Sequence, residues 1–428
     1  MRLIILPLDA VCAAALLPLA VLLLAWNRTA PRRTAGQGSL FHLSGGSSTA
    51  QVIQKFGSLD VLFETTPGTE AFASNVLFWF PSRASLTKRL DNSWTILEQR
   101  AAFSVLPLAG IALYFIRAAR AIRRHDVRAI RAWDATYSGF AGWVLARTAR
   151  LPLAVSIHAD YDKRFELAGA AGATRVFGSR EWAKRMERFV LRHADLVMPI
   201  RSTLMDKVLD AGVARSRVHL IPHGLDLTPF EAPPDESLRE KLGVAADRKI
   251  ISFAGRLSDE NYVDDILHMA RTLAAQRDDF TVVLAGEGPT ETRVRETIAG
   301  DKALVRCAVA VGRLSHEEVI ALRGLSALSL CLMGGFSLIE ACAAGRPVIA
   351  YDVEWHGELV RDGETGFLLR EGDTAGLVDA AGRLLDDEVL AASFGAAARE
   401  LAFANHSLES TTEIKRQAYA KLLAAGAR

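Results

Sequence analysis

A single glutamate stands among apolar and small residues in the stretch GGFSLIEACAAGRPVIAYD, residues 334–352. This acid, Glu340, follows two glycines and a short apolar run that predicts the start of a largely buried helix. Burying a carboxylate without a partner is costly in free energy. We therefore expect Glu340 to have a partner, which is either a ligand, the end of a helix, or a basic neighbour.

Several other residues carry side chains that suit chemistry on a polar ligand. His158 ends the run VSIH, where it is either a functional group or a satisfied core histidine. Asp160 and Asp162 form a D-x-D pattern, which indicates either a manganese site or acids that cap a helix.

The bulk composition of the 428 residues limits the kinds of protein that this chain can be. Its length suits two or three domains, and its 50% hydrophobic content allows large buried cores. The formal net charge of +2 argues against a nucleic-acid partner selected by overall charge. The four cysteines form no C-x-x-C pair, so neither a zinc ribbon nor a dithiol redox motif is present, and their scatter fits a reducing compartment.

Apolar runs that end in glycine or polar residues alternate with helical patterns along two blocks of the chain. The blocks are residues 38–228 and 247–400, and the stretch between them, 229–246, is rich in proline and charge and predicts a linker. This rhythm predicts two α/β domains with parallel, doubly wound sheets. Ligands of such sheets bind outside the carboxyl ends of the strands.

The N-terminus, residues 1–37, differs in kind from the rest of the chain. Residues 11–26 carry no charge, and a helix extended back to Leu3 could cross a hydrocarbon core of about 30 Å at about 1.5 Å per residue. More arginines follow this stretch than precede it, so the positive-inside rule places the bulk of the chain in the cytoplasm. A cleavable signal peptide and a helix in the membrane interface are the alternatives.

Two further stretches combine apolar and basic residues. Residues 101–131 hold a short apolar run with a basic end, which is typical of a buried helix with a solvated tip; a second membrane contact is the alternative. Residues 181–193 predict an amphipathic helix with a basic face, which is either merely solvated or meets anionic lipid.

Six blocks of the sequence occur in an order that is typical of one protein family. They are VSIHADYD, ADLVMPIRSTLMDKV, VHLIPHGLD, FAGRLSDENYVDDIL, LAGEGP and the block from Gly334 to Leu369. With them, the chain resembles the retaining glycosyltransferases of family GT4 over nearly everything after residue 38. The resemblance implies the GT-B fold, in which two Rossmann-like domains face each other. It also implies that a C-terminal helix, residues 401–428, packs back on the N-terminal domain.

The resemblance further implies an activity and a set of site residues. Family members move a sugar from a nucleotide-sugar with retention of the anomeric configuration, without a cofactor and generally without a metal. It implies catalytic positions for His158, at the donor sugar, and Arg256, at the diphosphate, and it places Glu340 on the ribose hydroxyls. It implies further donor-binding positions at Gly45, Gly46, Gly255, Asn261, Gly286, Gly288, Gly312, Arg313, Gly335, Phe336, Ser337 and Leu338.

The sequence departs from the family pattern at two places. A second acid is usual eight residues before the position of Glu340, but Leu332 stands there, or Gly334 if the loop is shorter. A lysine is usual five residues after the diphosphate arginine, and Asn261 stands there, followed by Tyr262 instead of the usual glycine. Because cations stabilise a departing diphosphate, the loss of one cation favours compensation by another arginine or a weaker activity.

These observations together predict a bacterial glycosyltransferase anchored in the inner membrane by one N-terminal segment, with both catalytic domains in the cytoplasm. The expected partners are a nucleotide-sugar donor, a glycan or lipid-linked acceptor and the membrane, with no nucleic acid and no metal. The alternatives are a non-catalytic glycosyltransferase-like subunit of a membrane assembly and a nucleotide-sugar 2-epimerase of the same fold.

Overall fold

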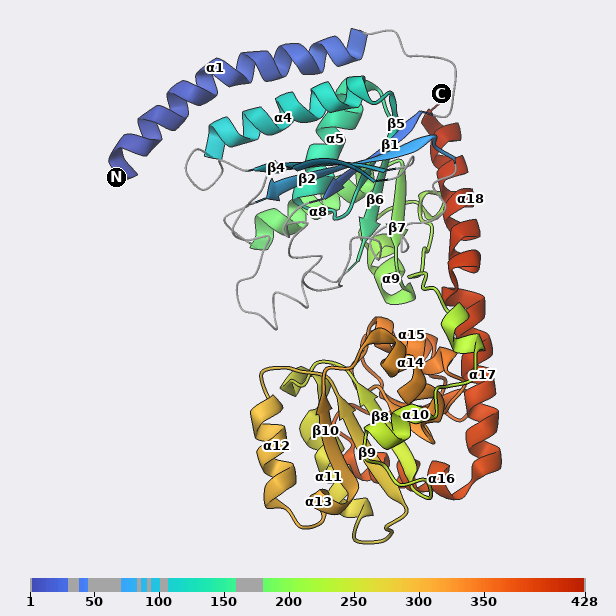
Figure 1. Cartoon of the computed structure of the whole chain (residues 1–428). Coiled ribbons are helices and arrows are strands. Elements are labelled where there is room, and N and C mark those ends of the chain that lie inside the picture. Colours follow the sequence, from blue (N-terminus) through green and yellow to red (C-terminus); the bar gives the residue numbers. More distant parts are fainter. Residues whose placement is uncertain are drawn as a thin grey trace. The chain divides into compact units, whose positions relative to one another are not determined.

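The computed structural model divides the chain into two compact units. Unit 1 comprises residues 1–222 and 411–428, and unit 2 comprises residues 223–410 (Figure 1). The stretch 229–246, predicted as a linker, therefore lies within unit 2, whose core contains Phe230. The residues that the structure describes are 2–29, 38–44, 71–82, 86–90, 94–100, 107–158 and 180–426.

Unit 1 is built on a seven-stranded sheet of order β3-β4-β2-β1-β5-β6-β7. All neighbouring strands are parallel except the edge pair β3 and β4, which is antiparallel. The strands are β1 (Ser39–Ser44), β2 (Ser74–Ser82), β3 (Leu86–Leu90), β4 (Trp94–Arg100), β5 (Val127–Ala132), β6 (Leu153–Ile157) and β7 (Leu196–Pro199).

Helices cover both faces of the unit 1 sheet, because alternate strand residues point to opposite sides. Phe41 and Leu43 of β1 join a core formed with the helices α4, α5, α8 and α9. Leu40 joins a second core with Tyr419 of α18. An additional apolar helix, α1, contacts α4 and α5. The helices are α1 (Arg2–Thr29), α4 (Pro107–Arg124), α5 (Tyr137–Ala149), α8 (Arg180–His193), α9 (Ser202–Asp210) and α18 (Leu408–Gly426), with a 3-10 turn η1 (Arg215–Arg217).

Unit 2 contains a six-stranded, fully parallel sheet of order β10-β9-β8-β11-β12-β13. Counted along the chain, this is the doubly wound order 3-2-1-4-5-6, whose direction of winding reverses between β8 and β11. The strands are β8 (Lys249–Ala254), β9 (Phe280–Ala285), β10 (Ala308–Gly312), β11 (Leu328–Leu330), β12 (Val348–Tyr351) and β13 (Gly366–Leu369).

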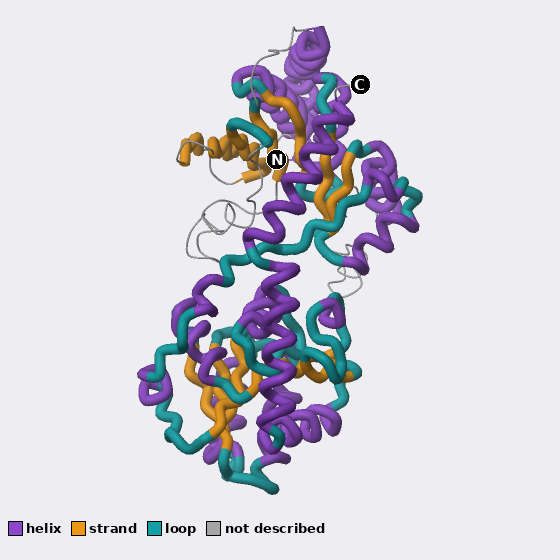
Figure 2. Tube along the Cα trace, turned by 90° about the vertical axis from the view of Figure 1, so that its right-hand side faces the viewer, coloured by secondary structure: helices purple, strands orange, loops and turns teal. Residues whose placement is uncertain are grey.

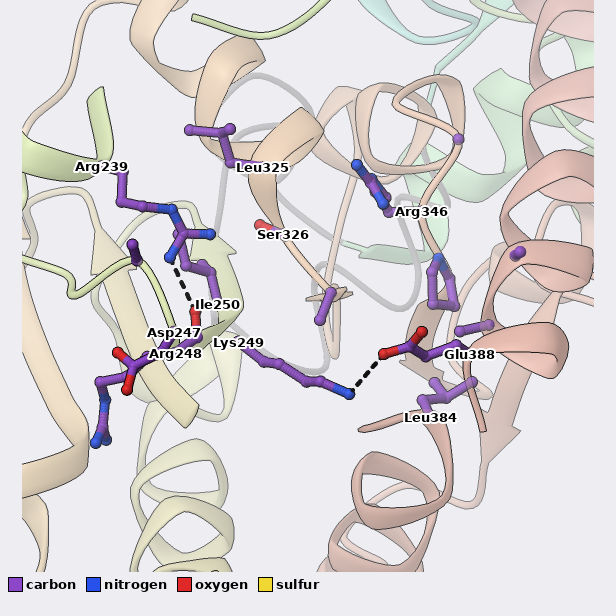
Figure 3. A pocket seen from close by; sticks show the side chains of 16 residues that line it. Arg239, Asp247, Arg248, Lys249, Ile250, Leu325, Ser326, Arg346, Leu384 and Glu388 are labelled. Atoms are coloured by element: carbon purple, nitrogen blue, oxygen red, sulfur yellow. Dashed lines mark hydrogen bonds and ion pairs between the residues drawn. The ribbon is translucent and has the colours of Figure 1, made fainter. Parts of the chain in front are cut away.

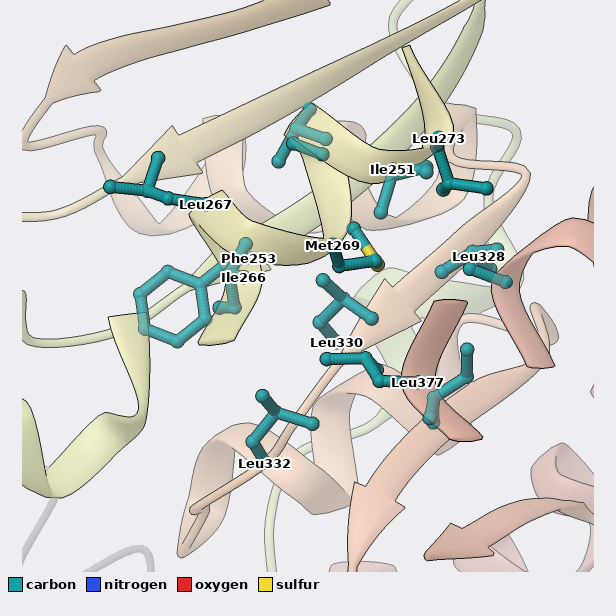
Figure 4. Close-up of a cluster of buried hydrophobic side chains, with 14 of the residues drawn as sticks. Ile251, Phe253, Ile266, Leu267, Met269, Leu273, Leu328, Leu330, Leu332 and Leu377 are labelled. Carbon is teal, nitrogen blue, oxygen red and sulfur yellow. The ribbon is translucent and has the colours of Figure 1, made fainter. Parts of the chain in front are cut away.

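The unit 2 strands lie between helices, as Figure 2 shows, and are buried on both faces. Ile251 and Phe253 of β8 pack against Ile266 and Met269 of α11 and Leu377 of α16 (Figure 4). The opposite face of the sheet packs against α10, α14, α15 and α17. The helices are α10 (Ser237–Lys241), α11 (Val263–Leu273), α12 (Glu291–Gly300), α13 (Leu304–Cys307), α14 (His316–Leu325), α15 (Phe336–Ala343), α16 (Thr374–Asp386) and α17 (Glu388–His406), with 3-10 turns η2 (Thr228–Glu231), η3 (Asp259–Asn261) and η4 (His356–Glu358).

Candidate functional site

Three loops at the carboxyl edge of the unit 2 sheet are joined by backbone hydrogen bonds. Gly255, which follows β8, donates its N–H to the carbonyl oxygen of Ala285 at the end of β9, at 3.0 Å. Gly286, the next residue, donates to the carbonyl oxygen of Gly312 at the end of β10, at 2.7 Å. The structure therefore brings together the glycines that the sequence places after three different strands.

Two of these loop positions accept only glycine. Gly286 has φ +139°, and a Cβ atom there would lie 1.9 Å from the carbonyl oxygen of Gly255. A Cβ on Gly288 would lie 2.1 Å from the carbonyl oxygen of Leu257. Such contacts are far inside van der Waals range, so the close approach of the two loops depends on the missing side chains. The predicted roles of Gly286 and Gly288 are thus first of all roles in shaping the loop.

The start of α15 lies beside the end of β8, at the point where the winding of the sheet reverses. Ser337 donates a hydrogen bond from Oγ to the carbonyl oxygen of Ala254, at 2.8 Å. Gly335 is the exposed residue that precedes the helix, and Phe336 is half-buried. The side chain of Leu338 is fully buried in the core, so only its backbone is available to a ligand.

Glu340 has two basic neighbours. Its side chain is 17% exposed, with Oε2 at 3.6 Å from Nη2 of Arg323 and Oε1 at 3.8 Å from Nδ1 of His316. Arg323 is 1% exposed and also donates to Oγ of Ser337 at 2.7 Å. Both contacts of the carboxylate are longer than a hydrogen bond, so its oxygens keep the capacity to accept hydroxyl groups of a ligand. Neither basic residue was predicted from the sequence as part of the site.

Two arginines at this edge of the sheet are free to meet an anion as far as the described residues go. Arg256 follows β8 and Arg313 follows β10, and both are exposed. Neither forms an ion pair with any residue that the structure describes. Asn261 uses its amide differently, because Nδ2 donates to the carbonyl oxygen of Arg256 at 2.7 Å and to Oγ of Ser258 at 3.2 Å. Asn261 thus fixes the loop that carries Arg256.

Tyr262 shows why a glycine is usual after position 261. Its backbone is left-handed, with φ 55° and ψ 38°, a conformation that glycine adopts without strain and other residues avoid. The tyrosine compensates through its side chain. Its ring centroid lies 5.0 Å from that of Tyr351, and its hydroxyl bonds to Glu371.

The loop between β11 and α15 is held by a buried histidine. His356 donates from Nδ1 to the carbonyl oxygen of Tyr351 at 2.8 Å, and its Nε2 accepts the N–H of Gly334 at 3.1 Å. Burial lowers the pKa of His356, so its ring stays neutral and can keep accepting that N–H.

In unit 1, the predicted His158 follows directly after β6. Its carbonyl oxygen accepts a hydrogen bond from Nη2 of Arg201 at 3.5 Å, and its ring centroid lies 6.4 Å from the ring of Trp133. The predicted loop residues Gly45 and Gly46 lie outside the described residues, as do both acids of the D-x-D pattern. Within the described ranges, no cluster of three or more histidine, cysteine or acidic side chains is arranged to hold a metal ion.

A pocket of roughly 460 Å³ lies at the opposite, amino edge of the unit 2 sheet (Figure 3). Its cations are Arg239, Arg248, Lys249 and Arg346, and each donates to a backbone carbonyl oxygen. Lys249 also pairs with Glu388 at 3.1 Å. The positive charges are thus already used in hydrogen bonds to neighbouring backbone segments. This pocket is separate from the loops at the carboxyl edge of the sheet.

Both halves of the sequence match families of known proteins. Residues 234–401 match the family described as "Glycosyl transferases group 1", and residues 76–228 match "Glycosyltransferase Family 4". The chain is therefore a glycosyltransferase of the group 1 and family 4 type. It is similar to the alpha-maltose-1-phosphate synthase of Mycolicibacterium smegmatis, with 28% identity over 66% of this chain and 77% of the relative. It is also similar to the alpha-D-kanosaminyltransferase of Streptomyces kanamyceticus, with 28% identity over 64% of this chain and 71% of the relative.

Solved structures confirm the GT-B fold of this glycosyltransferase. The HepE protein of Anabaena in complex with UDP matches with a TM-score of 0.65 and 17% identity, over 90% of this chain and 99% of that one. The sucrose-phosphate synthase of Thermosynechococcus elongatus matches with a TM-score of 0.65 and 20% identity, over 90% of this chain and 100% of that one. The predicted fold class, with its apolar N-terminal helix, is therefore confirmed.

We expect the glycosyltransferase to lose stability as the pH falls below about 6.5, the usual pKa of histidine in an unfolded chain. Burial lowers the pKa of His356, and burial together with Arg131 lowers the pKa of His42 to about 3. Below pH 6.5 the unfolded chain binds protons that the folded chain does not, so the free energy of unfolding falls by up to about 1.4 kcal/mol per pH unit for each histidine.

Urea unfolding between pH 5 and pH 7 measures this dependence. His42 is fixed as a neutral ring, because Nδ1 accepts from Nε1 of Trp133 at 3.3 Å and Nε2 donates to Oδ1 of Asn75 at 3.1 Å. A His42→Asn variant should show a shallower slope of stability against pH than the parent. An equal slope in both proteins would contradict the assignment to His42.

Proposed function

We propose that this glycosyltransferase is a retaining enzyme that moves a sugar from a nucleotide-sugar to a glycan or lipid-linked acceptor. One observation carries the proposal: Glu340, Ser337 and the Arg256 loop meet where the winding of the unit 2 sheet reverses, the usual ligand position of such sheets. The resemblance to the HepE protein of Anabaena, which has been solved with UDP and with UDP-glucose, supports a nucleotide-sugar as the donor.

In the proposed reaction, each group has a distinct task. The bond between the anomeric carbon and the diphosphate breaks, and negative charge develops on the departing nucleoside diphosphate. A bond to the acceptor oxygen forms, and the proton of the acceptor hydroxyl passes to the departing diphosphate. Arg256, assisted by Arg313, stabilises that charge, and backbone N–H groups of the glycine loops add to it. Glu340 accepts hydrogen bonds from the ribose hydroxyls, and His158 contacts the donor sugar. We propose no metal and no cofactor for this site.

The proposed cellular setting is the cytoplasmic face of a bacterial inner membrane, in surface polysaccharide or glycolipid synthesis. Nucleotide-sugars are made in the cytosol, which suits a donor site on that side. The arginines that follow the apolar N-terminal helix suit the anionic surface of the cytoplasmic leaflet. An acceptor attached to lipid suits an enzyme held at the membrane.

The test is a donor screen on the full chain in mild detergent. Thermal shift against UDP-, GDP- and ADP-sugars reports binding, and release of the nucleoside diphosphate with added membrane extract reports transfer. We expect a shift with one base, release that needs the extract, and loss of both in Glu340→Ala. A thermal shift without release of the nucleoside diphosphate would favour a non-catalytic subunit. Release without any acceptor would favour an epimerase or a hydrolase. The absence of a thermal shift with every nucleotide-sugar would refute the donor site.

We expect Asn261→Lys to raise kcat/KM by about tenfold, the equivalent of about 1.4 kcal/mol in the activation free energy. The substitution adds the second cation that the family usually carries beside its diphosphate arginine, where charge develops in the transition state. Asn261→Gln, which adds no charge, serves as the control. An equal change in both variants would show that loop geometry, rather than charge, governs this position.

A further inference from the structure

The apolar helix α1 packs lengthwise on α4 (Figure 1). The buried residues of α1 at this contact form a seam of mostly small side chains. Ala13, Ala20 and Asn27 recur every seven residues and are only 3%, 3% and 9% exposed. Asn27 donates from Nδ2 to the carbonyl oxygen of Ala119 at 3.1 Å, a buried contact between the two helices. A seven-residue spacing keeps one face of a helix against its neighbour, so the seam is a specific docking surface.

The partner of this seam is a fixed part of unit 1. On its other side, α4 buries Tyr114, Ala118 and Ile122 in the core that packs against the sheet. Near the end of α1, the guanidinium carbon of Arg123 lies 3.6 Å from the ring centroid of Trp26. A docked α1 therefore cannot cross a bilayer, because crossing would carry the arginines of α4 and part of a folded domain into hydrocarbon.

The outer side of α1 is apolar and uncovered. Val11 and Leu22 are each 67% exposed, and these two positions share a face because eleven residues make about three helical turns. Leu19 and Val21, which are also exposed, lie on either side of this face within about a quarter turn. A contiguous exposed apolar surface of this kind marks a contact with a membrane or a protein.

The charges around this surface indicate which of the two partners, a membrane or a protein, it contacts. Arg28, Arg120 and Arg124 are exposed near the end of α1. Asp9 is the single acid in the three packed helices α1, α4 and α5. An apolar strip flanked by arginines, on helices that carry a single acid, complements anionic lipid headgroups over an acyl layer.

We propose that α1 lies in the plane of an anionic bilayer and holds unit 1 on its surface, without spanning the membrane. The inference rests on the proposed membrane location but not on the sugar chemistry. It gives α1 two faces with separate tasks, a seam of small residues for docking on α4 and an apolar face for entering the lipid interface.

Depth measurements on the full chain test this geometry. Spin labels are placed singly at Val11 and Leu22, in a background without native cysteines, and the protein is bound to vesicles of phosphatidylglycerol and phosphatidylethanolamine. An in-plane helix gives both labels the same shallow depth. A spanning helix separates them by about 16 Å along the membrane normal, and that result would overturn the proposal. A label at Val389, an exposed residue of α17, should stay in water.

Charge variants provide a second, independent measurement. Leu22→Glu should weaken vesicle binding by at least about tenfold, because one large apolar side chain no longer enters the interface. Val389→Glu, which is 82% exposed, should change nothing. Unchanged vesicle binding of Leu22→Glu would refute the proposal. A parent protein that forms a dimer in solution, and a Leu22→Glu variant that loses the dimer but keeps its vesicle binding, would refute it as well. The nucleotide thermal shift of each variant reports the donor site separately, so the two proposals fail independently.

Discussion

Replacing Arg256 by alanine should lower kcat by about 10²–10³ while leaving the fold intact, because a positioned donor at developing charge contributes on that scale. Arg256 is exposed, follows β8 and has no ion pair within the described part of the chain. Its removal therefore leaves no buried partner behind. We expect a free energy of unfolding within about 0.5 kcal/mol of the parent, as is usual for surface substitutions. Release of nucleoside diphosphate under saturating donor measures the effect.

Two companion variants show whether the effect belongs to the diphosphate. Arg256→Lys keeps the charge but loses the planar, two-pronged donor geometry, so it should recover only part of kcat. Arg271→Ala removes another exposed arginine of unit 2, which pairs with Asp301 near the end of α11, and should leave kcat unchanged. A similar loss of activity in Arg271→Ala would mean that general charge, and not position, is responsible. Full activity of Arg256→Ala would contradict its catalytic assignment.

Much of the fold could be predicted because apolar runs report buried strands directly. The run before Arg256 became β8, and the runs before Gly286 and Arg313 became β9 and β10. The order of these strands in the sheet could not be predicted from the runs alone. It depends on which strands pair across the chain, and this pairing is what brings the β8 loop beside the start of α15.

Candidate site residues that act through their own type stood out in the sequence, whereas those that act through their surroundings did not. Glu340 was noticeable as an acid among apolar residues. Arg323 was not, because an arginine on a helix normally points to water, and its burial depends on α15 packing over it. The left-handed backbone of Tyr262 was equally hidden, since tyrosine rarely adopts it.

Arg323, the buried partner of Glu340, is the position at which we expect the largest effect on stability. Arg323→Met should lower the free energy of unfolding of unit 2 by about 3–5 kcal/mol, because it removes the charged partner from a largely buried carboxylate. Oγ of Ser337 loses its donor at the same time. Glu340→Gln should cost less, since that side chain is 17% exposed and lies 3.6 Å from the guanidinium. Urea unfolding of the full chain, in which the transition of unit 2 is monitored, measures both losses of stability.

The double variant Arg323→Met, Glu340→Gln distinguishes a coupled pair from two independent residues. If Arg323 stabilises the fold mainly through Glu340, the double variant should be more stable than the sum of the single losses predicts, by about 0.5–3 kcal/mol. Arg323→Lys should hold the fold better than Arg323→Met yet still weaken nucleotide binding, because one ammonium cannot hold Ser337 and Glu340 in place together. Strict additivity, with nucleotide affinity unchanged in Arg323→Lys, would show that Arg323 is only a packing residue. Glu340 would then bind its ligand without being positioned by Arg323 of α14.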